Sequence, residues 1–151
     1  MSSNTEGQVV GVRLCVGHRE PMRSVTTAKM VKDYGLEGDR HAGGEGPRKA
    51  RQALLMDRET LEEFGLPDGE VRENLTISGL DFSTLLEGQR LSVGEVELEV
   101  TGDCAPCARI DEIRPGLKAE LQGRRGILVM VLRTGTVSVG DGVRVLETAA
   151  S

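Results

Sequence analysis

Two cysteine thiols, Cys104 and Cys107, lie three residues apart in a segment punctuated by Gly102 and Pro106. The segment follows a strand-like stretch over residues 96–101, and its glycine and proline predict a loop at the edge of a barrel or sheet. A thiolate is the strongest nucleophile and the softest ligand among protein side chains, so it could transfer sulfur, bind a soft metal or exchange disulfides. We expect the chemistry at this loop, because loops on a rigid scaffold give reactive groups access to solvent and cofactor.

The third cysteine, Cys15, lies in an apolar strand pattern and is predicted to be buried. Cys15 and His18 could still join Cys104 and Cys107 in a zinc site, since tetrahedral zinc accepts three thiolates and one imidazole. Strong zinc sites usually place each pair of ligands on its own tight turn, so a zinc-stabilised binding module is the weaker alternative. A thioredoxin-like redox pair is disfavoured as well, because no βαβ pattern surrounds the two thiols.

The composition favours one small domain with an aliphatic core. The chain has 151 residues with no Trp, one Tyr and two Phe, so Val, Leu, Ile, Met and Ala must fill the interior. The net charge of -5 argues against a nucleic-acid binder, which would need a basic face. An anionic ligand would therefore require a local cluster of arginines. We expect residues 1–7 to be a flexible N-terminus and residues 8–148 to form a single domain.

No apolar stretch of about 18 residues occurs, and the first eight residues are polar. Neither a membrane span nor a secretory signal is therefore expected. Three cysteines without an export signal fit a reducing compartment, and we expect a cytoplasmic protein with no membrane partner.

The hydrophobic pattern predicts many short strands and few helices. The predicted strands are 10–16, 24–31, 71–77, a hairpin over 90–100, a central strand over 127–132 and a second hairpin over 136–146. Arg72 and Asn74 would project from one face of the 71–77 strand. Asp57 and Gly65 bound the clearest helix, a second short helix covers 117–121, and the glycine-rich stretch 34–48 reads as a long loop. Strands adjacent in sequence favour an antiparallel, mostly-β domain, and we expect a small closed β-barrel with a few short helices.

Four phrases, in this order, carry a family resemblance. They are Gly35-Leu36-Glu37-Gly38-Asp39-Arg40-His41-Ala42-Gly43, Arg72-Glu73-Asn74-Leu75-Thr76-Ile77-Ser78-Gly79, Gly88-Gln89-Arg90-Leu91-Ser92-Val93-Gly94 and Cys104-Ala105-Pro106-Cys107. Together they resemble a MOSC domain, the module named after the C-terminal part of molybdenum cofactor sulfurases. The resemblance implies a β-barrel of the pyruvate-kinase-like type and a catalytic cysteine. It also implies relatives that handle sulfur or that use molybdenum to reduce N-hydroxylated compounds.

The resemblance assigns roles to individual residues. Cys107 falls on the thiol that ligates molybdenum or accepts sulfur, with Ala105 in the same loop, and Arg72 and Asn74 fall on the phrase that contacts the pterin cofactor. Cys104 matches a first thiol that some members have. A pterin phosphate is a dianion, so convergent donors are needed to hold it. The further candidates are Arg40, Arg109 and Lys29, with His41 as a catalytic donor.

Two activities are compatible with this resemblance. The first is a molybdenum-cofactor protein that acts on N-oxygenated small molecules and receives electrons from an electron-transfer protein. The second is a persulfide carrier for metal-sulfur cofactor assembly, in which Cys107 takes sulfur from a donor such as a cysteine desulfurase and Cys104 expels it by forming a disulfide. The pyridoxal-phosphate domain of the sulfurases has no room in this chain, so desulfurase activity is not expected. Arg124 and Arg125 are predicted to form a solvated turn rather than a phosphate clamp.

Overall fold

The computed structural model describes residues 6–17, 21–40, 42–43, 52–104 and 108–146. Within these residues the chain forms short strands, three short α-helices and one 3-10 turn over Phe82–Thr84. The strands are β1 (Glu6–Leu14), β2 (Arg23–Val25), β3 (Thr27–Val31), β4 (Gly35–Leu36), β5 (Ala53–Asp57), β6 (Leu75–Ser78), β7 (Arg90–Val93), β8 (Val96–Asp103), β9 (Ile127–Arg133), β10 (Gly135–Ser138) and β11 (Gly142–Leu146). The helices are α1 (Arg58–Glu63), α2 (Ala108–Ile113) and α3 (Leu117–Glu120).

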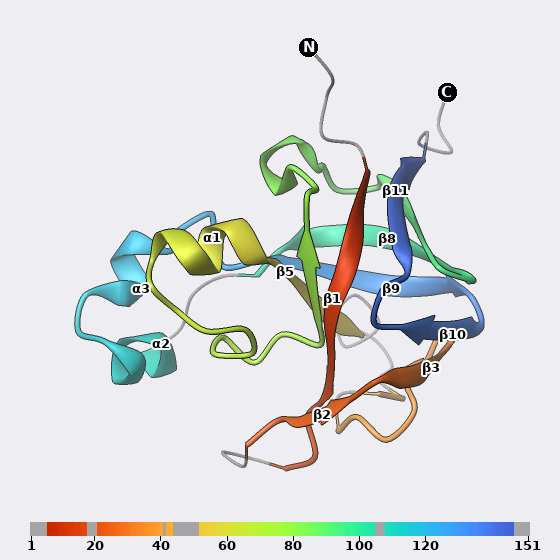
Figure 1. Ribbon diagram of the computed structural model, residues 1–151, viewed down its shortest axis with the longest axis horizontal. Helices are drawn as coiled ribbons and strands as arrows, with labels where there is room; N and C mark the ends of the chain where they lie inside the picture. Colours follow the sequence, from red (N-terminus) through yellow and green to blue (C-terminus); the bar gives the residue numbers. More distant parts are fainter. Residues whose placement is uncertain (1–5, 18–20, 41, 44–51, 105–107, 147–151) are drawn as a thin grey trace.

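Seven strands close into a barrel, which confirms the predicted fold class. The strand order is β11-β7-β8-β9-β5-β6-β1, and β1 closes the ring by pairing with β11. β2 extends along the end of β1, and β10, β3 and β4 form a separate three-stranded sheet. Figure 1 shows the barrel on one side of the molecule and the three helices gathered on the other.

In β7, β8 and β9 alternate side chains are buried and face the barrel interior, whereas β5 and β6 are buried at consecutive positions. In β8, Val96, Leu98 and Val100 are buried, whereas Glu97 and Glu99 on the other face are half-exposed. The β7–β8 hairpin turns at Gly94, whose φ of 57° suits glycine, and the predicted hairpin is confirmed. β9 pairs with β8 and β5, so its predicted central position is also confirmed.

The predicted hairpin over 136–146 is wrong, because its two strands belong to different sheets. β10 pairs with β3, and β11 pairs with β7 and β1. The turn between them is bonded to β1 instead: Gly140 N–H donates to the Val9 carbonyl at 2.8 Å, and Val9 N–H donates to the Asp141 carbonyl at 2.9 Å. These bonds direct the chain from the small sheet into the barrel.

Two further expectations about the strands need correction. β5 and β6 are parallel, with α1 in the connection between them, so the barrel is not wholly antiparallel. The strand predicted over 71–77 begins only at Leu75. Arg72 precedes it in a turn with φ 64°, and its N–H donates to the Gly69 carbonyl at 3.0 Å. Arg72 and Asn74 therefore do not share a strand face.

The helices form a lobe with its own apolar core at one side of the barrel. Buried residues of this core include Met56, Leu61, Ile110, Leu117 and Leu121. α1 begins after Asp57 and ends before Gly65, whose φ of 69° stops it, as the sequence predicts. The short helix predicted over 117–121 is confirmed as α3, whereas α2, directly after the cysteine loop, was not predicted. In the part of the chain that the structure describes, no helix is both long and apolar enough to cross a membrane.

Candidate functional site

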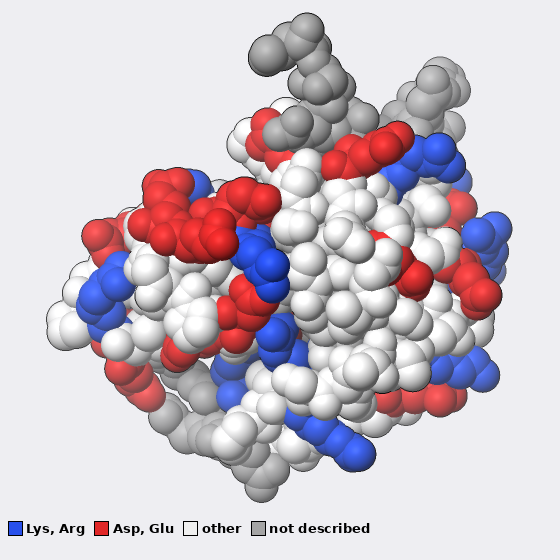
Figure 2. Space-filling model, in the orientation of Figure 1, with Lys and Arg blue, Asp and Glu red and all other residues white. Residues whose placement is uncertain are grey.

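A cavity of about 570 Å³ lies where the helical lobe meets β1, β2 and the turn before β6. Its volume is in the range typical of small-molecule sites. It is lined by Arg13, Pro21, Met22, Ser24, Asp68, Gly69, Glu70, Val71, Arg72, Ile110, Glu112, Ile113 and Arg125. Figure 2 shows basic side chains gathered in the hollow between the helical lobe and the barrel, whereas acidic side chains cover the outer face of α1. Three arginines, Arg13, Arg72 and Arg125, line this cavity together with three carboxylates, Asp68, Glu70 and Glu112.

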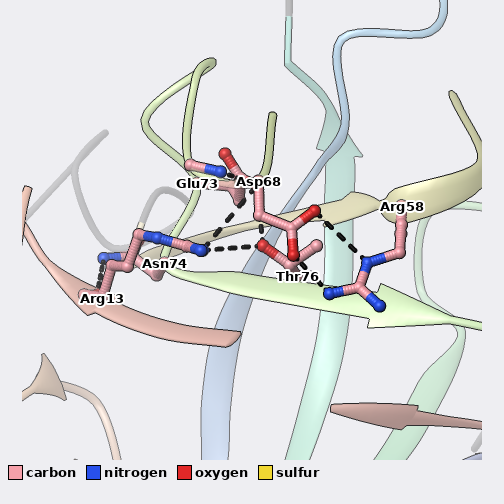
Figure 3. A network of polar contacts seen from close by, with 7 residues as sticks. Arg13, Arg58, Asp68, Glu73, Asn74 and Thr76 are labelled. Carbon is pink, nitrogen blue, oxygen red and sulfur yellow. Dashed lines mark hydrogen bonds and ion pairs between the residues drawn. The ribbon is translucent and has the colours of Figure 1, made fainter. Parts of the chain in front are cut away.

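Arg13 projects from β1 and is held by Thr76 and Glu73. Its Nη1 donates to Thr76 Oγ1 at 2.8 Å and lies 3.9 Å from the Glu73 carboxylate (Figure 3). Two glycines leave room for the guanidinium. A Cβ atom at Gly69 would lie 2.6 Å from Arg13 Nε, and one at Gly11 would lie 2.9 Å from Nη1. Arg13 is thus a positioned charge in the cavity wall.

Glu73 is a fully buried carboxyl group that connects Arg13 to the turn carrying Arg72. Its Oε2 accepts hydrogen bonds from Gly69 N–H at 2.8 Å and from Thr76 Oγ1 at 2.7 Å. Burial raises the pKa of Glu73 above its ordinary value of 4.5, although these bonds and the Arg13 charge act in the opposite direction. The residue thereby fixes the Gly69 turn at the cavity edge and the Arg13 charge together.

Replacing Glu73 by glutamine should change how stability depends on pH. Because the folded state raises the Glu73 pKa, the stability that its proton contributes is fully present below pH 4.5 and is lost as the pH rises through the folded pKa. Glu73→Gln keeps an oxygen acceptor for Gly69 and Thr76 but cannot ionise. Each tenfold change in proton affinity corresponds to about 1.4 kcal/mol, so the wild type should lose stability relative to Glu73→Gln as the pH rises. Urea unfolding of both proteins across this range measures the difference, and a pH-independent difference would contradict this role of burial.

Arg72 reaches from the same turn toward β1. Its Nη2 donates to the Cys15 sulfur at 3.2 Å and to the Gly17 carbonyl at 3.3 Å. Cys15 is 3 % exposed, which confirms that it is buried. Arg72 lines the cavity, and its Nη2 is hydrogen-bonded to residues at and just beyond the end of β1.

Asn74 is 4 % exposed and joins three segments behind the cavity. Its Oδ1 accepts from Leu54 N–H at 3.0 Å, and its Nδ2 donates to the Arg13 carbonyl at 3.1 Å and to Asp39 Oδ1 at 3.0 Å. Asp39 Oδ1 also accepts from Cys15 N–H at 2.6 Å. The amide of Asn74 is thus engaged with β1, β5 and the Asp39 turn, and the residue does not line the cavity.

Three residues of this site, Arg13, Glu73 and Arg125, are not predicted from the sequence, and Arg125 is the one for which the prediction is wrong. It is 8 % exposed and lines the cavity, so the predicted solvated turn is wrong at this position. Only Arg124 behaves as predicted: it is partly exposed and pairs with Glu63 at 2.7 Å. The sequence signal for the burial of Arg125 is its place in the chain, because Arg125 and Gly126 directly precede the buried strand β9.

The remaining predicted site residues are distributed around this region. Cys104 follows β8, is 7 % exposed, and its N–H donates to the Gly126 carbonyl at 3.0 Å. Arg40 is exposed, with its N–H donating to the Cys15 carbonyl at 2.8 Å, and Lys29 is exposed on β3; neither lines the cavity. Arg109 lies in α2, without a described side chain. Three predicted residues lie outside the described residues: Cys107, Ala105 and His41.

The zinc alternative gains no support from the described residues. Among them, no group of three or more His, Cys, Asp or Glu side chains could hold a metal ion. Two of the four ligands considered, His18 and Cys107, lie outside the described part of the chain.

A second cavity of about 310 Å³ lies near the start of α1 and includes Asp57, Asp103 and Arg124. Burial raises the pKa of the Asp57 carboxyl, against a lowering hydrogen bond from Thr60.

Comparison with known proteins places the chain in a family. The family model described as the MOSC domain matches residues 47–144, which is more than half of the chain. The chain belongs to the MOSC domain family. This family is linked to proteins of the molybdenum cofactor sulfurase type. A search of curated proteins found no significant match.

Solved structures of other proteins share the MOSC fold with this chain. The YuaD protein from Bacillus subtilis matches with a TM-score of 0.77 and 22 % identity, covering 93 % of this chain and 95 % of that one. YiiM from Escherichia coli matches with a TM-score of 0.70 and 20 % identity, covering 95 % of this chain and 72 % of that one. YiiM from Geobacillus stearothermophilus gives a TM-score of 0.73 and 19 % identity, with coverages of 93 % and 75 %. At these identities the likeness shows the fold alone.

Proposed function

We propose that the arginine-lined cavity binds the molybdenum cofactor and that Cys107 supplies a thiolate ligand to its metal. One observation carries this proposal: Arg13, Arg72 and Arg125 line a single cavity in an acidic MOSC domain. Guanidinium groups are suited to phosphate because their planar donors match its oxygens. The cofactor's phosphate is an anion of this kind.

The apolar part of the cavity lining also supports the proposal. Ile110 and Ile113 of α2 contribute apolar side chains to the cavity lining, against which a pterin ring could pack. Cys107 directly precedes α2 in the sequence, and only two residues, Ala108 and Arg109, separate it from Ile110. Their Cα atoms are therefore at most about 11 Å apart, which keeps the thiol within reach of the cavity. A soft thiolate is an appropriate ligand for a metal in a sulfur-rich environment.

The protein's residues would bind and orient rather than transfer protons. The arginines would attract and orient the anionic end of the cofactor, and Glu73 keeps Arg13 and the Gly69 turn in place. When bound, the molybdenum centre would supply oxygen-atom removal from an N-oxygenated small molecule. An electron-transfer protein would then be the partner that restores the reduced state.

The metal and pterin content of the purified protein tests this proposal. In a host that makes the cofactor, the wild type should carry molybdenum and fluorescent pterin in near-equal amounts. Cys107→Ser should carry at least about tenfold less molybdenum per protein than the wild type, because a hydroxyl is a poor substitute for a thiolate ligand. Cys104→Ser is the matched control and should retain both components, since Cys104 is buried and has no assigned role at the metal.

Other outcomes would favour other activities and contradict this one. A mass increase of one sulfur atom on Cys107, with neither molybdenum nor pterin, would indicate the persulfide carrier with a cysteine desulfurase as donor. Stoichiometric zinc that depends on Cys15 would indicate the binding module. Full molybdenum content in Cys107→Ser would exclude the thiolate ligation proposed here.

A further inference from the structure

We propose that Arg125 is the anion anchor of the cavity, the residue that receives the tetrahedral oxyanion of the bound ligand. The inference rests on the proposed function, because it names which of the three arginines holds the phosphate. Its evidence is separate, since it comes from the hydrogen-bonding state of each guanidinium. The resemblance to the family points to Arg72 and Asn74 instead, so the proposal changes the expected roles.

Two of the three arginines already have acceptors. Arg13 donates to Thr76 and lies beside the Glu73 carboxylate, with glycines on either side of its guanidinium. Arg72 donates to Cys15 and to the Gly17 carbonyl. These contacts fix both side chains within the cavity wall.

Arg125 differs from both. Its Nε and Nη1 are buried and have no hydrogen-bond partner among the described residues, and its side chain is more than nine-tenths buried. A guanidinium keeps its charge permanently, so burying it without an acceptor is unfavourable. A buried guanidinium without an acceptor indicates that a hydrogen-bonding partner is missing. Because Arg125 lines the cavity, that partner would be a ligand bound in the cavity.

The required partner is an anion with several acceptor atoms. A phosphate monoester or an inorganic oxyanion presents oxygens in a tetrahedron and can satisfy N–H groups on more than one edge of a guanidinium. Three carboxylates, Asp68, Glu70 and Glu112, also line the cavity, and Asp68 is engaged by Arg58 Nε at 3.3 Å. None of the described carboxylates hydrogen-bonds to the buried Nε or Nη1 of Arg125. The positive charges of Arg13 and Arg72 would add longer-range attraction without giving up their own hydrogen bonds.

Thermal unfolding of Arg125→Met and Arg124→Met, with and without millimolar inorganic phosphate at constant ionic strength, tests the inference. Arg124 is the matched control because it neighbours Arg125 but pairs with Glu63 on the surface. Phosphate should raise the Tm of the wild type and of Arg124→Met. Arg125→Met should unfold at a higher temperature than the wild type without phosphate, because it removes an unpaired buried charge. It should also lose the response to phosphate, with at least about a tenfold loss of affinity by calorimetry.

A merely structural arginine would behave in the opposite way. A lower Tm or failure to fold for Arg125→Met, a retained phosphate response in that variant, or no response in the wild type would overturn the inference. The outcome is separable from that of the proposed function, because inorganic phosphate needs no molybdenum. Arg125-dependent phosphate binding in a protein that never carries molybdenum or pterin would refute the cofactor proposal alone. Full cofactor loading of Arg125→Met would refute the anchor alone.

Discussion

Asn74→Ala is expected to lower the free energy of unfolding by about 3–4 kcal/mol, with or without a ligand in the cavity. The substitution leaves the buried Leu54 N–H without its side-chain acceptor and removes donors to the Arg13 carbonyl and Asp39. Each buried polar group that loses its partner costs about 1–3 kcal/mol, and domains are stable by only about 5–15 kcal/mol. Asn74 therefore contributes to the site chiefly by holding β1, β5 and the Asp39 turn together.

Urea unfolding of the ligand-free protein measures this effect. Lys29→Ala is the control, because Lys29 was predicted alongside Asn74 as a cofactor contact but is exposed on β3. It should change stability by less than about 0.5 kcal/mol. An unfolding midpoint for Asn74→Ala equal to that of the wild type would show that the buried amide does not hold these segments.

Gly126→Ala is expected to lower the free energy of unfolding by about 3–5 kcal/mol and to displace the neighbouring Arg125 of the site. Gly126 has φ 111°, and a Cβ atom there would lie 2.5 Å from the Leu55 carbonyl oxygen in β5. The backbone must shift, because the clashing atom belongs to the main chain of β5 and not to a flexible side chain. The Gly126 carbonyl also accepts a hydrogen bond from Cys104 N–H at 3.0 Å. A shift of the backbone at Gly126 would therefore displace both the neighbouring Arg125 and Cys104.

The control for this prediction is Gly123→Ala, which separates backbone strain from the steric clash. Gly123 also has a positive φ, 79°, but nothing lies within 4 Å of the position of its added Cβ. It should cost only about 1–2 kcal/mol, the usual penalty for a side chain in the left-handed region. If both alanine variants unfold at the same denaturant concentration, the close approach to Leu55 is not what requires glycine at position 126.

Local patterns in the sequence predicted those elements whose partners are adjacent in the chain. The β7–β8 hairpin and the inward row of β8 follow from strict alternation around Gly94, and α1 follows from Asp57 and Gly65. Strand pairing between distant segments is not encoded in such patterns. The turn at Gly140 therefore looked like a hairpin, although hydrogen bonds to Val9 direct β10 and β11 into different sheets.

The same limit applies to the site. Arg72 was found because it stands in a recognisable phrase, yet its positive-φ turn was read as strand. Arg125 was read as solvated because burial of a charged residue depends on tertiary packing that no local pattern encodes. Glu73 lies between two predicted residues but was not considered, since a buried carboxyl becomes evident only when Gly69 and Thr76 are seen to bond to it.

The most direct test of the account is to locate molybdenum in crystals of the protein purified from a cofactor-producing host, by anomalous diffraction at the molybdenum edge. We expect one molybdenum peak in the cavity lined by Arg13, Arg72 and Arg125, with the Cys107 sulfur as a ligand and the cofactor phosphate at Arg125. A molybdenum peak in the acidic cavity beside Asp57, or loaded crystals in which Cys107 lies away from the metal, would contradict it.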